Sequence, residues 1–136
     1  MGNIWFELGE HTFPEKNWYD FAETITGWWV AALIELYRSN GKWHEKSLLF
    51  MDGPCEAVLR NGSPVTIHFK HHGAVEKSFP IELAHLAHSI LTSRRNLLQH
   101  AVSVGWKQSA HADLELCDWL STLIMQTPDK AKRPVN

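Results

Sequence analysis

Histidine is the residue type here with the greatest capacity for metal binding or acid–base chemistry, because the 136-residue chain contains nine of them. His85 and His88 have the i, i+3 spacing that presents two imidazoles on one side of a helix. The sequence around them lacks the glutamate of an HExxH motif. We therefore expect solvated or locally hydrogen-bonded histidines, no metal and no cofactor, and the role of His85 and His88 stays open.

Catalysis by other residue types has few candidates. Cys55 and Cys117 have no CxxC partner, which is typical of buried thiols in a reducing cytosol. No serine lies in a GxSxG elbow, and the eight glycines lack the spacing of a phosphate-binding loop. Asp20 and Glu23 are neighbours on the exposed side of a predicted helix, without a cleft signal. We therefore expect no catalytic residue and a protein that is not an enzyme.

The elements that must position these side chains start with a strand at 4–8 and a loop through Gly9 and Pro14. The clearest element is a helix from 18 to 36 that Asn17 caps and the segment 39–41 ends. Its apolar positions form one wide stripe that we assign to the core, and they are Trp18, Phe21, Ala22, Ile25, Trp28, Trp29, Ala32, Leu33 and Leu36.

A predicted meander follows, with strands at 48–51, 55–60 and 65–70 and an Asn61-Gly62 hairpin turn. Gly73 turns the chain into a weak edge strand at 75–77. A helix then runs from Pro80 to residue 101 with Arg94 interrupting its apolar stripe, and after a stop at Gly105 a last helix begins at 109 or 111.

The predicted fold class is α+β, in the order β-α-β-β-β-(β)-α-α. An antiparallel sheet with about three helices on one face is the simplest arrangement that buries these apolar faces. Residues 1–127 are expected to form a single domain, followed by a polar C-terminal tail at 128–136.

Charge is distributed unevenly along the chain. The net charge is only −2, which argues against a dedicated nucleic-acid binder. Residues 1–36, however, carry six acidic side chains and one lysine, an asymmetry that can steer a basic partner to one end of the molecule. The sequence has no basic and apolar secretion signal, and its longest uncharged apolar run, at 25–34, is about half a membrane span. We expect a cytoplasmic protein without membrane or nucleic-acid partners.

Four short motifs resemble a known protein family. They are Phe13-Pro14, Trp18-Tyr19-Asp20-Phe21, Gly27-Trp28-Trp29 and Phe50-Met51-Asp52-Gly53-Pro54. The pattern is similar to that of bacterial immunity proteins, the partners of polymorphic and contact-dependent growth-inhibition toxins. The resemblance covers residues 13–60, under half of the chain, and its motifs look structural.

The resemblance implies a protein that binds one cognate toxin domain, of the nuclease type, and neutralises it by non-covalent association. Such toxins are often basic, and an acidic surface would accelerate capture. From the charge asymmetry alone we predict the partner-binding residues to be Glu10, Glu15, Asp20, Glu23, Asp52 and Glu56. In the turn 52–54, Asp52 also suits a structural role, because its carboxylate can bond to the amides that follow.

Two alternatives remain open. The chain is also compatible with a small-molecule-binding or regulatory module whose pocket contains Trp28, Trp29 and Trp106. A small hydrolase that uses the histidines and scattered acids is the third interpretation. The identity and activity of the toxin, the surface that binds it, an active-site or exosite mode of inhibition and the oligomeric state do not follow from the residues.

Overall fold

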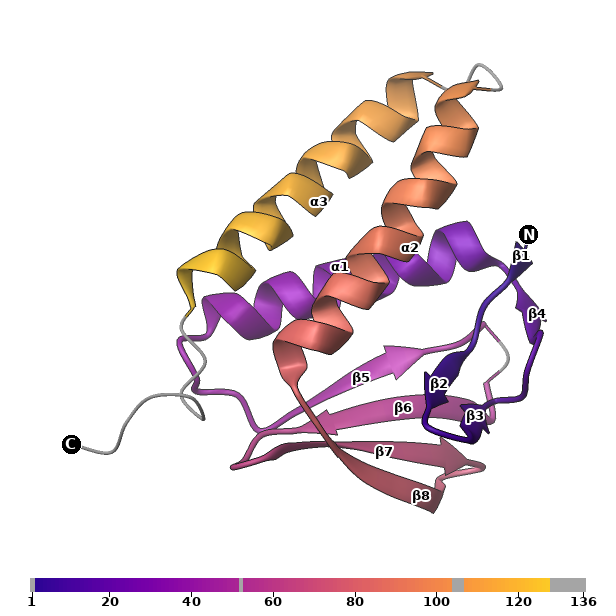
Figure 1. Cartoon of the computed structure of the whole chain (residues 1–136), viewed down its shortest axis with the longest axis vertical. Coiled ribbons are helices and arrows are strands. Elements are labelled where there is room, and N and C mark those ends of the chain that lie inside the picture. Colours follow the sequence, from indigo (N-terminus) through magenta and orange to yellow (C-terminus); the bar gives the residue numbers. More distant parts are fainter. Residues whose placement is uncertain (1, 52, 104–106, 128–136) are drawn as a thin grey trace.

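The computed structural model describes residues 2–51, 53–103 and 107–127, and it confirms the predicted α+β fold (Figure 1). Its strands are β1 (Gly2–Asn3), β2 (Phe6–Leu8), β3 (His11–Phe13), β4 (Tyr19–Asp20), β5 (Glu45–Leu49), β6 (Cys55–Arg60), β7 (Val65–His71) and β8 (Ala74–Ile81). Its helices are α1 (Ala22–Arg38), α2 (Leu83–Ser103) and α3 (Lys107–Gln126). None of the described helices is both long and apolar enough to cross a bilayer. The predicted stop at Gly105 and the tail at 128–136 lie outside the described residues.

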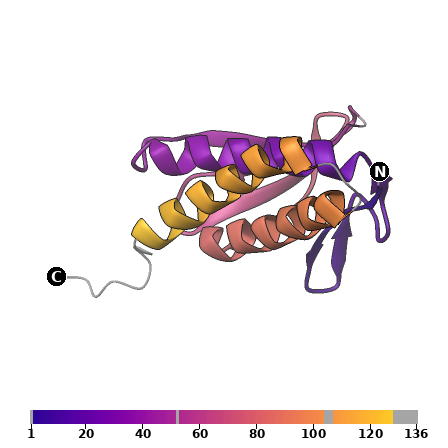
Figure 2. The same ribbon diagram turned by 90° about the horizontal axis from the view of Figure 1, so that it is seen from above.

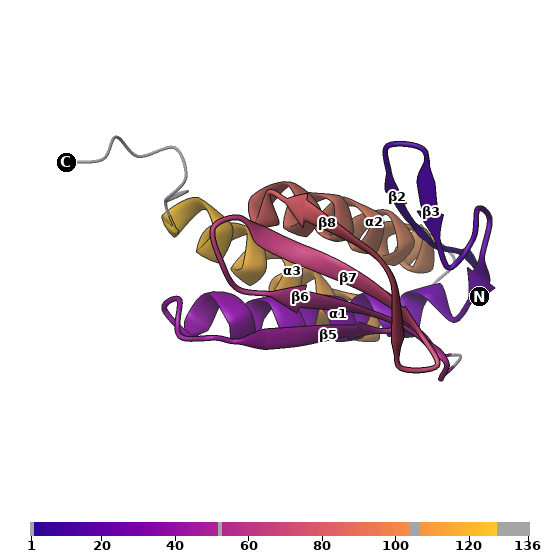
Figure 3. The same ribbon diagram turned by 90° about the horizontal axis from the view of Figure 1, so that it is seen from below.

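The main sheet is antiparallel in the order β5-β6-β7-β8, and the three helices cover one of its faces (Figures 1 and 2). Side chains alternate between the two faces along each strand. The covered face therefore presents a buried apolar set, which is Leu48, Ala57, Leu59, Ile67 and Phe69. We call the opposite face, which Figure 3 views from below, the open face. It carries Glu45, Glu56, Val58, Arg60, Thr66, His68 and Lys70.

Residues 2–20 pack against the covered face at one end of the molecule (Figure 3). β2 pairs with β3, and β1 pairs with β4, both antiparallel. Phe6 and Phe13 lie with their ring centroids 5.6 and 4.6 Å from that of Phe69. The predicted loop at 9–14 therefore contains a strand, β3, which carries Phe13 into the aromatic core.

α1 begins at Ala22, four residues later than predicted. Tyr19 pairs with Asn3, and the backbone N–H of Ile4 donates to the carbonyl of Trp18 at 2.7 Å, so this stretch is extended. Asn17, the predicted cap, has a φ of 63° and lies well before the helix. Pairing with the N-terminal segment therefore outweighs the helical periodicity of 18–21. The predicted end of the helix is confirmed, since α1 stops at Arg38 with Ser39 as its C-cap.

The β6–β7 hairpin was predicted correctly, but Asn61 acts differently from the expectation. Neither Asn61 nor Gly62 has a positive φ. The Asn61 side chain instead donates to the carbonyls of Gly41 and Trp43 at 3.1 and 2.9 Å. These hydrogen bonds connect the β6–β7 turn to the segment that follows α1.

β8 is longer than the weak strand predicted at 75–77, and α2 starts at Leu83 rather than at Pro80. Pro80 lies in β8, which is an edge strand of the sheet. Proline has no backbone N–H. An edge strand tolerates it at positions where the N–H of another residue would face outward and make no ladder hydrogen bond. The proline that suggested a helix start therefore marks a strand edge.

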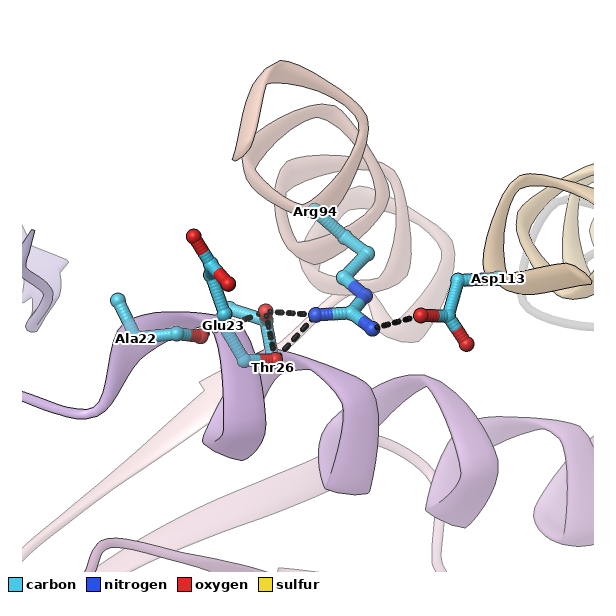
Figure 4. Close-up of polar contacts among 5 residues, drawn as sticks. All are labelled: Ala22, Glu23, Thr26, Arg94 and Asp113. Atoms are coloured by element: carbon cyan, nitrogen blue, oxygen red, sulfur yellow. Dashed lines mark hydrogen bonds and ion pairs between the residues drawn. The ribbon is translucent and has the colours of Figure 1, made fainter. Parts of the chain in front are cut away.

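Arg94 joins all three helices, and it explains the gap in the apolar stripe of α2 (Figure 4). Its side chain is 9% exposed, and its Nη1 donates to the backbone carbonyl of Glu23. Nη1 also lies 3.3 Å from the Thr26 hydroxyl, and Nη2 lies 3.1 Å from Asp113 Oδ2 on α3. A Cβ on Gly27 would come within 3.2 Å of Nη2, so glycine leaves room for the guanidinium in the middle of α1.

Candidate functional site

Asp20, one of the predicted partner-binding residues, is buried at 5% exposure. Its Oδ2 accepts a hydrogen bond from the indole of Trp18 at 3.0 Å, and its Oδ1 accepts one from the backbone N–H of Phe21 at 2.7 Å. The prediction that Asp20 stands on the exposed side of a helix is wrong, because β4 turns its side chain inward. Asp20 holds the backbone that leads into α1.

The residues on either side of Asp20 are exposed aromatics. Tyr19 and Phe21 are 62% and 45% exposed, since an extended chain turns alternate side chains to opposite sides. Trp28 is 43% exposed and comes seven residues after Phe21, the N-cap of α1, a spacing of about two helical turns that favours the same side of the helix. We call Tyr19, Phe21 and Trp28 the α1 aromatic surface.

The assignment of Trp28 to the core is therefore wrong, whereas that of Trp29 is right. Trp29 is 2% exposed, stacks on Phe6 and donates from Nε1 to the carbonyl of Leu49 at 2.8 Å. Adjacent helical residues point about 100° apart, so both tryptophans cannot occupy the centre of one face. The predicted stripe was too wide, and Trp28 lies beyond its edge.

Three of the predicted acidic residues come from the same end of the molecule as the α1 aromatic surface. Glu10 lies in the β2–β3 turn and Glu15 between β3 and β4, and both are exposed. Glu23 is half-buried in the first turn of α1, with its carboxylate directed away from Arg94 (Figure 4). Residues 2–20 stay together at this end in all three ribbon views.

Of the other two predicted residues, only Glu56 is described by the structure, and it lies elsewhere. Glu56 pairs in register with Leu49 and Lys70 on the open face, on the opposite side of the sheet from the β2–β3 hairpin. Asp52 lies outside the described residues, and so does Trp106 of the alternative tryptophan pocket. Among the described residues, the predicted acidic surface is therefore reduced to Glu10, Glu15 and Glu23.

The open face carries a polar cluster centred on His68. Its Nδ1 lies 2.6 Å from Ser78 Oγ and its Nε2 lies 2.9 Å from Thr66 Oγ1. In a neutral imidazole one nitrogen donates and the other accepts, so both bonds suit the uncharged ring. Partial burial, Arg60 and Lys70 lower the pKa of His68, whereas Glu45 raises it by a smaller amount.

This lowered pKa predicts a stability that falls in acid. The folded protein binds a proton on His68 less readily than the unfolded chain, so the contribution is complete above the ordinary histidine pKa of about 6.5 and is lost as the pH falls below it. We expect His68→Gln to lose less stability than the wild type between pH 7.5 and pH 5, measured by urea unfolding. The control is His88→Gln, at an exposed position of α2. An equal flattening of the pH profile in both variants would contradict this assignment.

The histidine and cysteine candidates are separate from one another. His85 and His88 are exposed on α2, and Glu82, one turn before His85, places its Oε2 3.8 Å from His85 Nδ1. Over the described part of the chain, no three His, Cys, Asp or Glu side chains gather where they could hold a metal ion. Cys117 is fully buried, and burial raises the pKa of its thiol, which makes it a weak nucleophile at neutral pH.

A groove with a volume of about 460 Å³ lies between β2, the end of β8 and the first turns of α2. Its floor is apolar and includes Phe6, Trp29 and Ile90. Glu7 and Glu82 are its acidic lining residues, and His85 lies beside Glu82. We call this cavity the β2–α2 groove.

Sequence analysis missed both the His68 cluster and the β2–α2 groove. Alternation on the predicted strand places Thr66 and His68 on one face, which is a usable signal. A β-bulge between Phe69 and Lys70 then brings Ser78 opposite His68. For the groove no local signal exists, because Glu7 and Glu82 are far apart along the chain and line the same groove only in the folded structure.

Comparison with protein-family models, curated proteins and solved structures finds no match to this chain.

Proposed function

We propose that this chain is an immunity protein that binds one bacterial toxin domain, of a basic nuclease type, and neutralises it by non-covalent association. The observation that supports this proposal is the α1 aromatic surface together with Glu10, Glu15 and Glu23 at the same end of the molecule. Aromatic anchors and acidic side chains together suit a basic protein partner.

The aromatic part of this surface provides affinity. Tyrosine and tryptophan are the residues most enriched among interface positions whose loss costs the most binding free energy. Tyr19, Phe21 and Trp28 keep much of their area in contact with solvent, and a partner that covers them gains the free energy of burying it. Asp20 orients the chain between Tyr19 and Phe21, so the surface is held in place before the partner arrives.

The acidic part of this surface raises the association rate and the selectivity for a basic partner. Residues 1–36 carry six acids and only Lys16 as a base, and three of these acids, Glu10, Glu15 and Glu23, lie at this end, which favours a negative potential there. Complementary charge raises the association rate of protein partners and disfavours partners of the same sign. A nuclease domain with a basic substrate-binding cleft fits this potential.

The test is co-expression with the C-terminal toxin domain encoded by the open reading frame immediately upstream. We expect a stable one-to-one complex in a pull-down and growth rescue in cells that make the toxin. A growth control with an unrelated toxin domain should give neither result. Toxicity that persists at full expression of this folded chain, with no complex, would refute the proposal for that partner.

The surface itself is tested by Trp28→Ala. We expect the Kd for the toxin domain to rise about 30-fold, which corresponds to roughly 2 kcal/mol for a central aromatic anchor. Trp119→Ala is a matched control, since Trp119 is 42% exposed on α3, almost as much as Trp28. Titration calorimetry measures both affinities. Equal Kd values for the two variants would exclude the α1 aromatic surface as the contact site.

A further inference from the structure

The β2–α2 groove combines an apolar floor with acidic walls. Fourteen residues line it, and they include Glu7 and Glu82 but no lysine or arginine. The one other group there that can carry charge is His85, whose Nδ1 lies 3.8 Å from Glu82 Oε2. The groove therefore has a local charge complementary to a cation.

The floor of the groove is rigid and aromatic. Trp29 is held by its bond to the Leu49 carbonyl and by the stacked ring of Phe6, whose centroid is 4.8 Å away. Trp5 adds a second, less buried indole to the lining. Of the two indoles, Trp5 has the exposed surface, and an exposed indole face attracts cations.

We propose that the β2–α2 groove binds a small organic cation with an apolar body, such as an arylalkyl ammonium ion. The apolar body lies against the partly exposed apolar lining, which includes Trp5, Ile81 and Leu86, and the ammonium group lies near the carboxylates of Glu7 and Glu82. The volume of about 460 Å³ falls within the range of about 300–1,000 Å³ typical of small-molecule sites. This site is distinct from the α1 aromatic surface, so it adds a ligand to the proposed function and does not depend on it.

The probe is 2-phenylethylammonium, titrated into the ¹⁵N-labelled full chain. We expect saturable shifts of the Trp5 and Trp29 indole signals and of backbone amides at 81–90. The neutral analogue 2-phenylethanol is expected to bind about tenfold more weakly, and 3-phenylpropanoate not to bind. The double variant Glu7→Gln/Glu82→Gln should lose about tenfold in affinity for the ammonium probe, since exposed charge pairs contribute modestly to binding.

Glu76→Gln is the matched control, because Glu76 is an exposed acid of β8 that does not line the groove, and this variant should keep wild-type affinity. Equal binding of the ammonium and the alcohol, or shifts spread outside the groove, would overturn the proposal. So would a toxin domain that perturbs these signals while the ammonium probe leaves them unchanged, because the groove would then belong to a protein interface. Trp28→Ala separates the two proposals, since it should weaken toxin binding and leave probe binding intact.

Discussion

Phe69→Ala is expected to lower the free energy of unfolding by about 4 kcal/mol, within the range of about 3–5 kcal/mol for Phe→Ala in a core. Phe69 is 1% exposed and packs against Phe6, Phe13, Phe79 and the ring of His11. Its removal leaves a cavity at the point where the N-terminal hairpin meets the sheet. A loss of this size is a large fraction of the roughly 5–15 kcal/mol that stabilises a typical domain.

Urea unfolding followed by tryptophan fluorescence measures this loss, and thermal unfolding should show a Tm lower by about 15 °C. Phe69→Leu keeps most of the volume and should cost clearly less. Phe21→Ala is the control, because Phe21 is 45% exposed and its removal should change stability by less than about 1 kcal/mol. If Phe69→Ala and Phe21→Ala had the same effect, Phe69 would not be the centre of the core.

Arg94→Ala is expected to cost about 3 kcal/mol, because breaking a buried ion pair leaves its partners without compensation. The Glu23 carbonyl and Asp113 would lose their guanidinium partner, and the space beside Gly27 would be empty. Asp113 is 37% exposed and retains some hydration. The expected loss of unfolding free energy is therefore at the lower end of the range of about 3–5 kcal/mol for breaking a buried ion pair. Arg94→Met fills the space without the charge and should cost about half as much.

Arg95→Ala is the matched control for Arg94. Arg95 makes a similar ion pair to α3, 3.0 Å from Asp118, but its partner is 75% exposed. Exposed pairs contribute about 0–1 kcal/mol, so this variant should unfold almost like the wild type. Amide hydrogen exchange of α3 provides a second measurement, since only loss of Arg94 should accelerate it. Equal destabilisation by the two substitutions would show that Arg94 does not join the three helices.

The predictable part of the fold is the part with a strong local pattern. β6 has the predicted bounds, 55–60, because Cys55, Ala57 and Leu59 alternate with Glu56, Val58 and Arg60, two of which are charged. The end of α1 follows from C-cap residues. Its start was not predictable from periodicity, since the stretch 18–21 is apolar at helical spacing yet pairs with the N-terminal segment. Pairing with a distant strand does not change the hydrophobic periodicity of the segment that becomes extended.

The candidate sites depend even more on long-range geometry. The turn at His72 and Gly73 alone would place Lys77 opposite His68, and the β-bulge shifts the register by one residue to bring in Ser78. Asp20 is likewise buried where β4 pairs with β1, although β1 comes well before it in the sequence. The uneven distribution of charge did predict acidic side chains toward the N-terminus. Glu10 and Glu15 stay exposed because they lie in turns, where charged side chains are hydrated.

The stacking of Phe13 on Phe69 also has a consequence for protein synthesis. More than fifty residues separate the two rings along the chain, so Phe6 and Phe13 can pack on Phe69 only after β7 has been made. At a translation rate of roughly 5–20 residues per second, the ribosome adds Phe69 about 3–11 s after Phe13. During this interval Phe6 and Phe13 lack their contact with Phe69 and have only earlier partners such as Trp29 and Phe50. The protein can therefore complete its fold only after the sheet has left the ribosome, although the acidic N-terminal end emerges earlier.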